Sequence, residues 1–153
     1  MGTVLAVVGA DGGAHQGEGA IEGSFKALYV QGEDIAQSDP DTQHVQKALE
    51  SLECLIVQDI FMNETAKYAH VILPGSSFLE KDGTFTNAER RISMVRKVMP
   101  PLAGLADWEV TVRFAEALGY RMSYAHPSEI MDEIARLTPT FTGVSYEKLN
   151  KLG

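Results

Sequence analysis

The hydrophobic residues of this chain gather into short runs, separated by polar segments and by longer stretches with helical spacing. Four apolar runs rich in β-branched residues predict buried strands, and they are TVLAVV (3–8), KALYV (26–30), CLIVQ (54–58) and HVILP (70–74). Short apolar strands that alternate with helices are typical of a parallel sheet with crossover helices. The pattern therefore predicts the α/β class.

Helical patterns occupy the intervals between these runs and most of the C-terminal part. The spacing predicts helices over about 39–52, 63–68, 108–118, 127–137 and 145–152. Asn63 and Asp107 precede two of them as expected N-caps. Residues 75–104 are expected to be mostly irregular, with a short strand within ERRISMVRKV (89–98).

Polar residues and a glycine follow the second and third predicted strands. Gly32, Glu33 and Asp34 come after one strand, and Gln58 and Asp59 hold the same place after the next. Parallel sheets bind ligands beyond the carboxyl ends of their strands, where these residues are expected to lie together. Carboxylates there can accept hydrogen bonds from ribose hydroxyls or from the donor edge of guanine. The sequence thus predicts a ligand crevice at this edge.

The same residues also have structural interpretations, which the sequence leaves open. Acids after strands are common as helix caps and turn formers, and this applies to Asp59 in particular. Lys81 is a natural counter-charge for a phosphate or for the acids around it, but Glu80 and Lys81 taken alone are expected to form a solvated turn.

Composition excludes several classes of function. The formal net charge of −8 argues against general binding to nucleic acid or to an anionic membrane. One cysteine, Cys54, cannot form an internal disulfide or a cysteine metal cage, and four scattered histidines make no metal motif. No apolar run approaches a membrane span, so a soluble cytoplasmic protein is expected.

A glycine-rich segment follows the first predicted strand. GADGGAHQGEGAIEGS (9–24) holds six glycines in sixteen residues, but it does not match the dinucleotide fingerprint G-x-G-x-x-G. A flexible connection is the expected role, and an NAD-binding loop is the alternative. Residues 1–25 are accordingly set apart as an N-terminal strand and joining segment.

Longer motifs resemble a known family. These are ALYVQGED, LIVQDIFMNETAKYAHVILPGSSFLEKDGTFTNAERR, DWEVTVRFAEALGY and YAHPSEIMDEIARLTPTFTGVSYEKLNKLG. In this order they resemble the molybdopterin oxidoreductases, and most closely the catalytic alpha subunits of formate dehydrogenases. The resemblance covers residues 26–153, and it implies a Rossmann-like, mostly parallel sheet flanked by helices.

The resemblance also implies a cofactor. The corresponding region binds one of two molybdopterin guanine dinucleotides, chiefly through the nucleotide end. By motif position Gly32, Glu33 and Asp34 would line the nucleotide pocket, while Gln58 and Asp59 would meet the guanosine. Lys81 would lie near the dinucleotide and Asp107 near the guanine, and the further candidates are Asn63 and Asn87.

The chain departs from the family in what it lacks. The family's iron–sulfur cysteines and its cysteine or selenocysteine metal ligand have no counterpart in this sequence. We therefore expect no catalytic residue, no metal ligand, no iron–sulfur cluster and no formate oxidation by this chain alone. The interpretation is a cofactor-binding domain fragment. Its expected partners are the other domains of the parent catalytic subunit, which carries molybdenum or tungsten, and electron-transfer subunits. The alternative is a non-enzymatic fragment with a structural or subunit-docking role.

Overall fold

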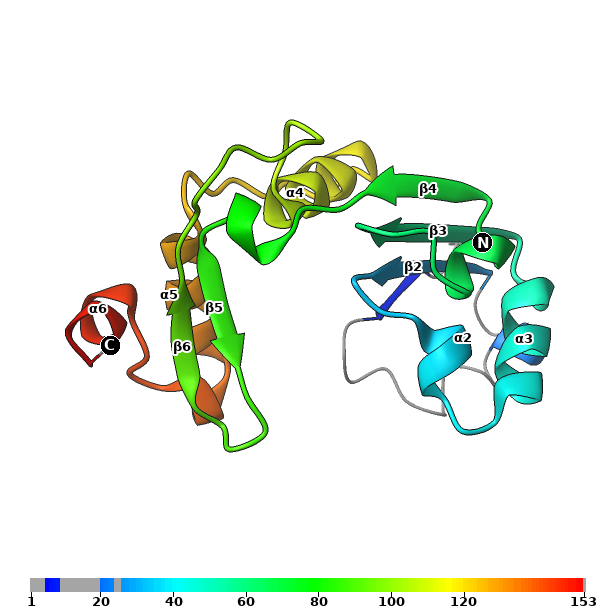
Figure 1. The fold of residues 1–153 in the computed structure, drawn as a ribbon, viewed down its shortest axis with the longest axis horizontal. Coiled ribbons are helices and arrows are strands. Elements are labelled where there is room, and N and C mark those ends of the chain that lie inside the picture. Colours follow the sequence, from blue (N-terminus) through cyan, green and yellow to red (C-terminus); the bar gives the residue numbers. More distant parts are fainter. Residues whose placement is uncertain (1–4, 9–19, 24–25, 153) are drawn as a thin grey trace. The chain divides into compact units, whose positions relative to one another are not determined.

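The computed structural model describes residues 5–8, 20–23 and 26–152 of the chain, with side chains for 20–23 and 26–151. The Gly-rich segment 9–24 therefore lies almost wholly outside the described residues. The chain forms two compact units, Met1–Gly75 and Ser76–Gly153 (Figure 1). No helix in the described ranges is long and apolar enough to cross a membrane.

The first unit is built on a four-stranded parallel sheet, in the order β1-β2-β3-β4. The strands are β1 (Leu5–Val8), β2 (Ala27–Gln31), β3 (Cys54–Asp59) and β4 (Val71–Pro74). Each lies within one residue or two of a predicted apolar run. The predicted α/β class with a parallel sheet is confirmed.

The core of the first unit lies between this sheet and α3 (Thr42–Ser51) (Figure 1). Side chains alternate between the two faces of a strand, so Leu28 and Val30 share one face of β2, as Leu55 and Val57 do on β3. These four pack in one cluster with residues of α3 and its end, namely Val45, Ala48, Leu49 and Leu52. The helical spacing seen in the sequence thus marks the buried face of α3.

Two short helices of this unit depart from the predictions. α2 (Ile35–Ser38) is a single turn that was not predicted, because four residues are too few to show a helical period. Its Ala36 N–H donates to Thr65 Oγ1 at 3.0 Å, so a residue distant in sequence helps to hold it. The predicted helix 63–68 is a 3₁₀ turn, η1 (Thr65–Tyr68).

The second unit contains a β-hairpin where the sequence predicted mostly irregular chain. After η2 (Phe78–Glu80), strands β5 (Gly83–Thr86) and β6 (Ile92–Val95) pair antiparallel. The turn between them is closed by Asn87, whose Oδ1 accepts from the backbone N–H of Glu89 and Arg91. β5 (GTFT) has a single large apolar residue, Phe85, so it shows no alternation of apolar residues, and for this reason it was missed.

Helices form the rest of the second unit. They are α4 (Asp107–Ala117), α5 (Pro127–Leu137), η3 (Pro139–Phe141) and α6 (Tyr146–Leu152). The expectation that Asp107 is an N-cap is wrong: Ala106 is the N-cap, and its N–H donates to Glu109 Oε2 at 2.7 Å. No residue of α4 is fully buried, and Leu118, predicted on its apolar face, is 60% exposed.

Candidate functional site

The C-terminal ends of the parallel strands in the first unit lie at one edge of the sheet. The segments that directly follow β2 and β3 are called tails below. Gln31 at the end of β2 is in register with Gln58 of β3, and Asp59 is in register with Pro74 of β4. Beyond the ladder, the Gly32 N–H donates to the Gln58 carbonyl at 2.9 Å. This edge therefore carries six predicted site residues, namely Gly32, Glu33, Asp34, Gln58, Asp59 and Asn63.

Asp34 joins the tail of β2 to the segment that follows β3. Its Oδ1 accepts from the Thr65 N–H at 2.9 Å and the Thr65 hydroxyl at 2.7 Å, and its Oδ2 accepts from the Glu64 N–H at 3.1 Å. Burial raises the pKa of this carboxyl, but the hydrogen bonds from Thr65 and Glu64 outweigh burial and hold the pKa below its ordinary value of 3.8. Asp34 thus has a clear structural role.

The lowered pKa of Asp34 predicts a dependence of stability on acid pH. A group whose pKa is depressed in the folded state stabilises that state above its unfolded pKa, and the contribution disappears as pH falls through the folded pKa. Between pH 5 and pH 2.5, urea unfolding should show a larger loss of stability for the wild type than for Asp34→Asn. Parallel curves for the two proteins would contradict a depressed Asp34 pKa.

Asp59 organises the turn that follows β3. Its Oδ1 accepts from the Ile60 N–H at 2.6 Å and the Phe61 N–H at 3.3 Å, and its Oδ2 accepts from Asn63 Nδ2 at 2.8 Å. Asn63 in turn accepts from the Ala66 N–H at 2.8 Å, so it stabilises the start of η1. The turn-forming interpretation of Asp59 therefore has direct support in these contacts.

Gln58 and Glu33 lie in different surroundings. Gln58 is fully buried, and its Oε1 accepts from the Tyr29 hydroxyl and from Gln31 Nε2, so it links β2 and β3. Glu33 has a buried oxygen, Oε2, for which the described residues supply no hydrogen-bond donor. Leaving a buried acceptor unsatisfied costs about 1–3 kcal/mol, and such groups are rare in native proteins.

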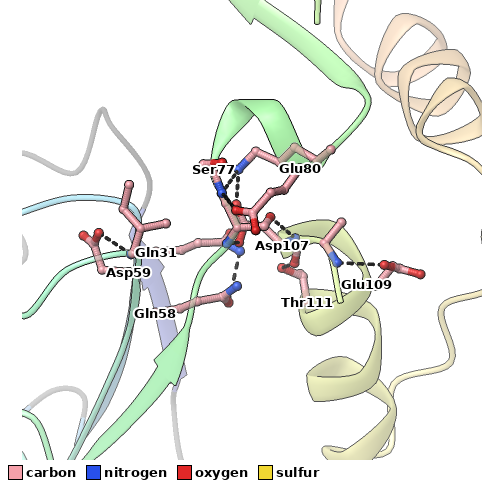
Figure 2. A network of polar contacts seen from close by, with 12 residues as sticks. Gln31, Gln58, Asp59, Ser77, Glu80, Asp107, Glu109 and Thr111 are labelled. Carbon is pink, nitrogen blue, oxygen red and sulfur yellow. Dashed lines mark hydrogen bonds and ion pairs between the residues drawn. The ribbon is translucent and has the colours of Figure 1, made fainter. Parts of the chain in front are cut away.

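A polar cluster organises the start of the second unit (Figure 2). Asp107 accepts from the Ser76 N–H at 2.8 Å and pairs with Lys81, whose ammonium also donates to the Ser76 carbonyl at 2.8 Å. The Lys81 and Asp107 side chains are 24% and 20% exposed, so the pair is shielded on most sides. The positive charge of Lys81 is therefore already neutralised by Asp107.

Glu80 lies beside this cluster, and the expectation of a solvated Glu80–Lys81 turn is wrong. Glu80 is 8% exposed and accepts from the Ser77 N–H at 2.7 Å and the Leu102 N–H at 2.6 Å. Hydrogen bonds from these two amides hold the pKa of its carboxyl below the ordinary value. Asn87, the remaining predicted residue, closes the hairpin turn.

Three residues that matter at this edge were not predicted from the sequence. Thr65 and Tyr29 are fully buried polar partners of predicted residues, which no local pattern reveals. Gly75 lies where β4 ends close to β3: a Cβ at this position would be 3.0 Å from the carbonyl carbon of Asp59. The glycine directly after VILP was the available signal for that close approach.

Comparison with known proteins adds to this geometry. The model of the molybdopterin oxidoreductase family matches residues 5–117. The chain belongs to this family. It is 50% identical over 133 residues to a putative formate dehydrogenase of Staphylococcus haemolyticus, covering 86% of this chain and 14% of that protein.

One further relative and one solved structure of similar fold extend the comparison for this molybdopterin oxidoreductase chain. It is 49% identical over 129 residues to the F420-dependent formate dehydrogenase subunit alpha of Methanocaldococcus jannaschii, covering 82% of this chain and 19% of that one. Acetylene hydratase from Pelobacter acetylenicus has a similar fold, with a TM-score of 0.66 at 20% identity, over 89% of this chain and 19% of that one. The chain spans less than a fifth of the length of these proteins.

Membership of the molybdopterin oxidoreductases implies a molybdopterin cofactor, and the described residues can be tested against one. Among them, no group of three or more His, Cys, Asp or Glu side chains is arranged to hold a metal ion. The first unit does offer Glu33 Oε2, an acceptor with no donor among the described residues, at the edge where parallel sheets bind ligands. An acceptor of this kind, Glu33 Oε2, fits a hydrogen-bond donor in the organic part of the cofactor.

Proposed function

We propose that this chain forms part of the cofactor-binding region of a formate dehydrogenase-like molybdopterin oxidoreductase. The edge formed by β2 and β3 would bind the guanosine end of molybdopterin guanine dinucleotide. The observation that carries the proposal is the unsatisfied buried oxygen of Glu33, which lies at this edge. Guanine presents adjacent N–H donors, and one that reaches Oε2 removes the cost of leaving this acceptor unsatisfied.

The neighbouring residues would shape the pocket. Gly32 has φ of +66°, and a Cβ built on it would meet no atom of the described residues within 4 Å, so these residues leave space above its backbone. Asp34 and Asp59 hold the two tails in place through the hydrogen bonds that they accept. A ligand would therefore bind to tails that are already ordered, which reduces the entropic cost of binding.

Other predicted contacts belong to the same proposal. Lys81 and Asp107 would act together on the dinucleotide, and Asn63 and Asn87 would be further contacts. Gln58, which is fully buried, would act only by linking β2 and β3 beneath the ligand. When bound, the cofactor would supply the redox chemistry through its molybdenum or tungsten. The role of this chain is to bind and orient the organic part, while other parts of a longer subunit and electron-transfer subunits would complete the enzyme.

Chemical-shift changes in the 15N-labelled chain test the proposal. Adding GMP should shift the amides of 32–34 and 58–63, and Glu33→Gln should weaken binding about tenfold, the value of one hydrogen bond to a charged group. Glu50→Gln, an exposed position on α3, is the matched control and should bind as the wild type does. Absence of shifts in the wild type, or equal affinity in Glu33→Gln, would contradict the proposal.

Parallel titrations separate the alternatives. AMP places an acceptor where guanine has a donor, so it should bind more weakly than GMP if Glu33 contacts the base edge. NAD should shift residues 9–19 instead if the glycine-rich segment is a dinucleotide loop. Stronger binding of NAD than of GMP would favour that alternative.

A structural or docking role is the second candidate, and exposed apolar side chains favour it. In the second unit Leu102 is 97% exposed, Val98 is 74% exposed and Leu137 is 69% exposed. Such side chains favour this role where they form one contiguous patch, because single exposed hydrophobic residues are ordinary. The two roles are compatible in a longer subunit, but silence in the GMP titration would leave docking as the better account.

A further inference from the structure

Three consecutive apolar residues are exposed where β3 ends. Ile60 is 50% exposed, Phe61 is 75% exposed and Met62 is 70% exposed. Single exposed hydrophobic residues are ordinary, but a run of three is unfavourable in water unless it serves a function. Their position after a parallel strand is the position at which such sheets bind ligands.

The backbone beneath this apolar turn is held by hydrogen bonds. The Asp59 carboxylate accepts from the N–H groups of Ile60 and Phe61, and the Asn63 N–H donates to the Phe61 carbonyl at 3.1 Å. Asn63 Nδ2 also donates to Asp59, which closes the turn from its other end. The Phe61 ring is therefore presented on a fixed support, so little backbone entropy is lost when a ligand covers it.

The turn is tied to the tail that carries Glu33. The Gly32 N–H donates to the carbonyl of Gln58, and Asp34 accepts from Thr65, shortly after the turn. Adjacent tails thus carry a hydrogen-bond acceptor, Glu33 Oε2, with no donor in the described part of the chain, and an exposed aromatic ring, that of Phe61. A planar heterocycle with N–H donors on one edge is complementary to both features. Its donor edge matches the Glu33 acceptor, and its apolar face matches the Phe61 ring.

We propose that Phe61 is the stacking platform for the purine base, a role that rests on the proposed function. Glu33 contacts the donor edge of the base, and the ring of Phe61 covers one face. Met62, with its flexible thioether chain, packs beside the base and fills the remaining space. Asp59 is then a positioning residue, because it sets the turn without contacting the base.

Substitutions of Phe61 test the platform by NMR titration with GMP. Phe61→Ala and Phe61→Leu should each bind GMP about 5–100-fold more weakly than the wild type, because they lose the stacking of the base on the aromatic ring. Phe61→Trp should bind at least as well as the wild type, and its added fluorescence should be quenched by GMP. Phe85→Ala, at a 53% exposed position on β5, is the matched control and should bind as the wild type does.

Ribose 5-phosphate, which has no base, separates stacking from a general structural effect. Its binding should be the same in the wild type and in Phe61→Leu. Equal loss of both ligands, or unchanged GMP affinity in Phe61→Leu with no quenching in Phe61→Trp, would overturn the platform and leave the GMP site standing. If the wild type itself fails to bind GMP, the proposed function falls, and the platform falls with it.

Discussion

Replacing Gly75 with valine is expected to destabilise the first unit by about 1–3 kcal/mol, the usual cost of overpacking a well-packed site. A Cβ at Gly75 would lie 3.0 Å from the carbonyl carbon of Asp59 and 3.2 Å from the backbone nitrogen of Ile60. Both atoms belong to the backbone, so neither can rotate away as a side chain would. Gly75→Ala should show a smaller loss in the same direction.

Urea unfolding followed by circular dichroism measures this effect. Gly83→Ala is the control, because a Cβ built there meets nothing within 4 Å. The Gly75 variants should also shift the amides of Asp59 and Ile60, since the Gly75 N–H donates to the Asp59 carbonyl at 2.9 Å. Equal stability of Gly75→Ala and Gly83→Ala would show that β3 and β4 separate at no cost.

Replacing Asp34 with alanine is expected to cost about 2–3 kcal/mol, because the variant loses hydrogen bonds made to a charged group. Thr65 is fully buried, and its N–H and hydroxyl both donate to this carboxylate. Without Asp34 these two donors lose their acceptor in the interior. The free energy of unfolding, from urea curves at pH 7, is the quantity to compare.

The neighbouring acid supplies a sharp control. Glu33→Ala removes a buried oxygen that has no donor among the described residues, so its stability should equal or exceed that of the wild type. Two adjacent carboxylates are thus expected to have opposite effects on folding. A similar loss of stability in both variants would mean that the local backbone, and not the hydrogen bonds of Asp34, determines the result.

These contrasts separate the acids at the sheet edge by what they contact. Asp34 and Asp59 accept hydrogen bonds from nearby N–H groups and hold the two tails, whereas Glu33 has an oxygen for which no described residue supplies a donor. The sequence places all three just after or at the end of a strand and offers no local sign of the difference. The difference depends on Thr65 and Asn63, residues brought near by the path of the chain after β3.

The hydrophobic pattern by itself determined the class of this protein, the four parallel strands and the helices α3 and α5. A buried strand or a helix face must repeat apolar residues at a fixed period, and that period is legible along the chain. The sequence also indicated the family, because the motifs within residues 26–153 occur in the order typical of that family. The edge of the sheet at which polar tails emerge followed from the same pattern.

Only the tertiary structure decided how the polar residues are used. β5 and α2 depend on hydrogen bonds to Asn87 and Thr65, and they have no hydrophobic period of their own. The ion pair of Lys81 joins it to Asp107, 26 positions away, and the requirement for Gly75 arises from the backbone of Asp59. Side-chain hydrogen bonds and close backbone contacts join residues distant in sequence, so only the folded chain reveals them.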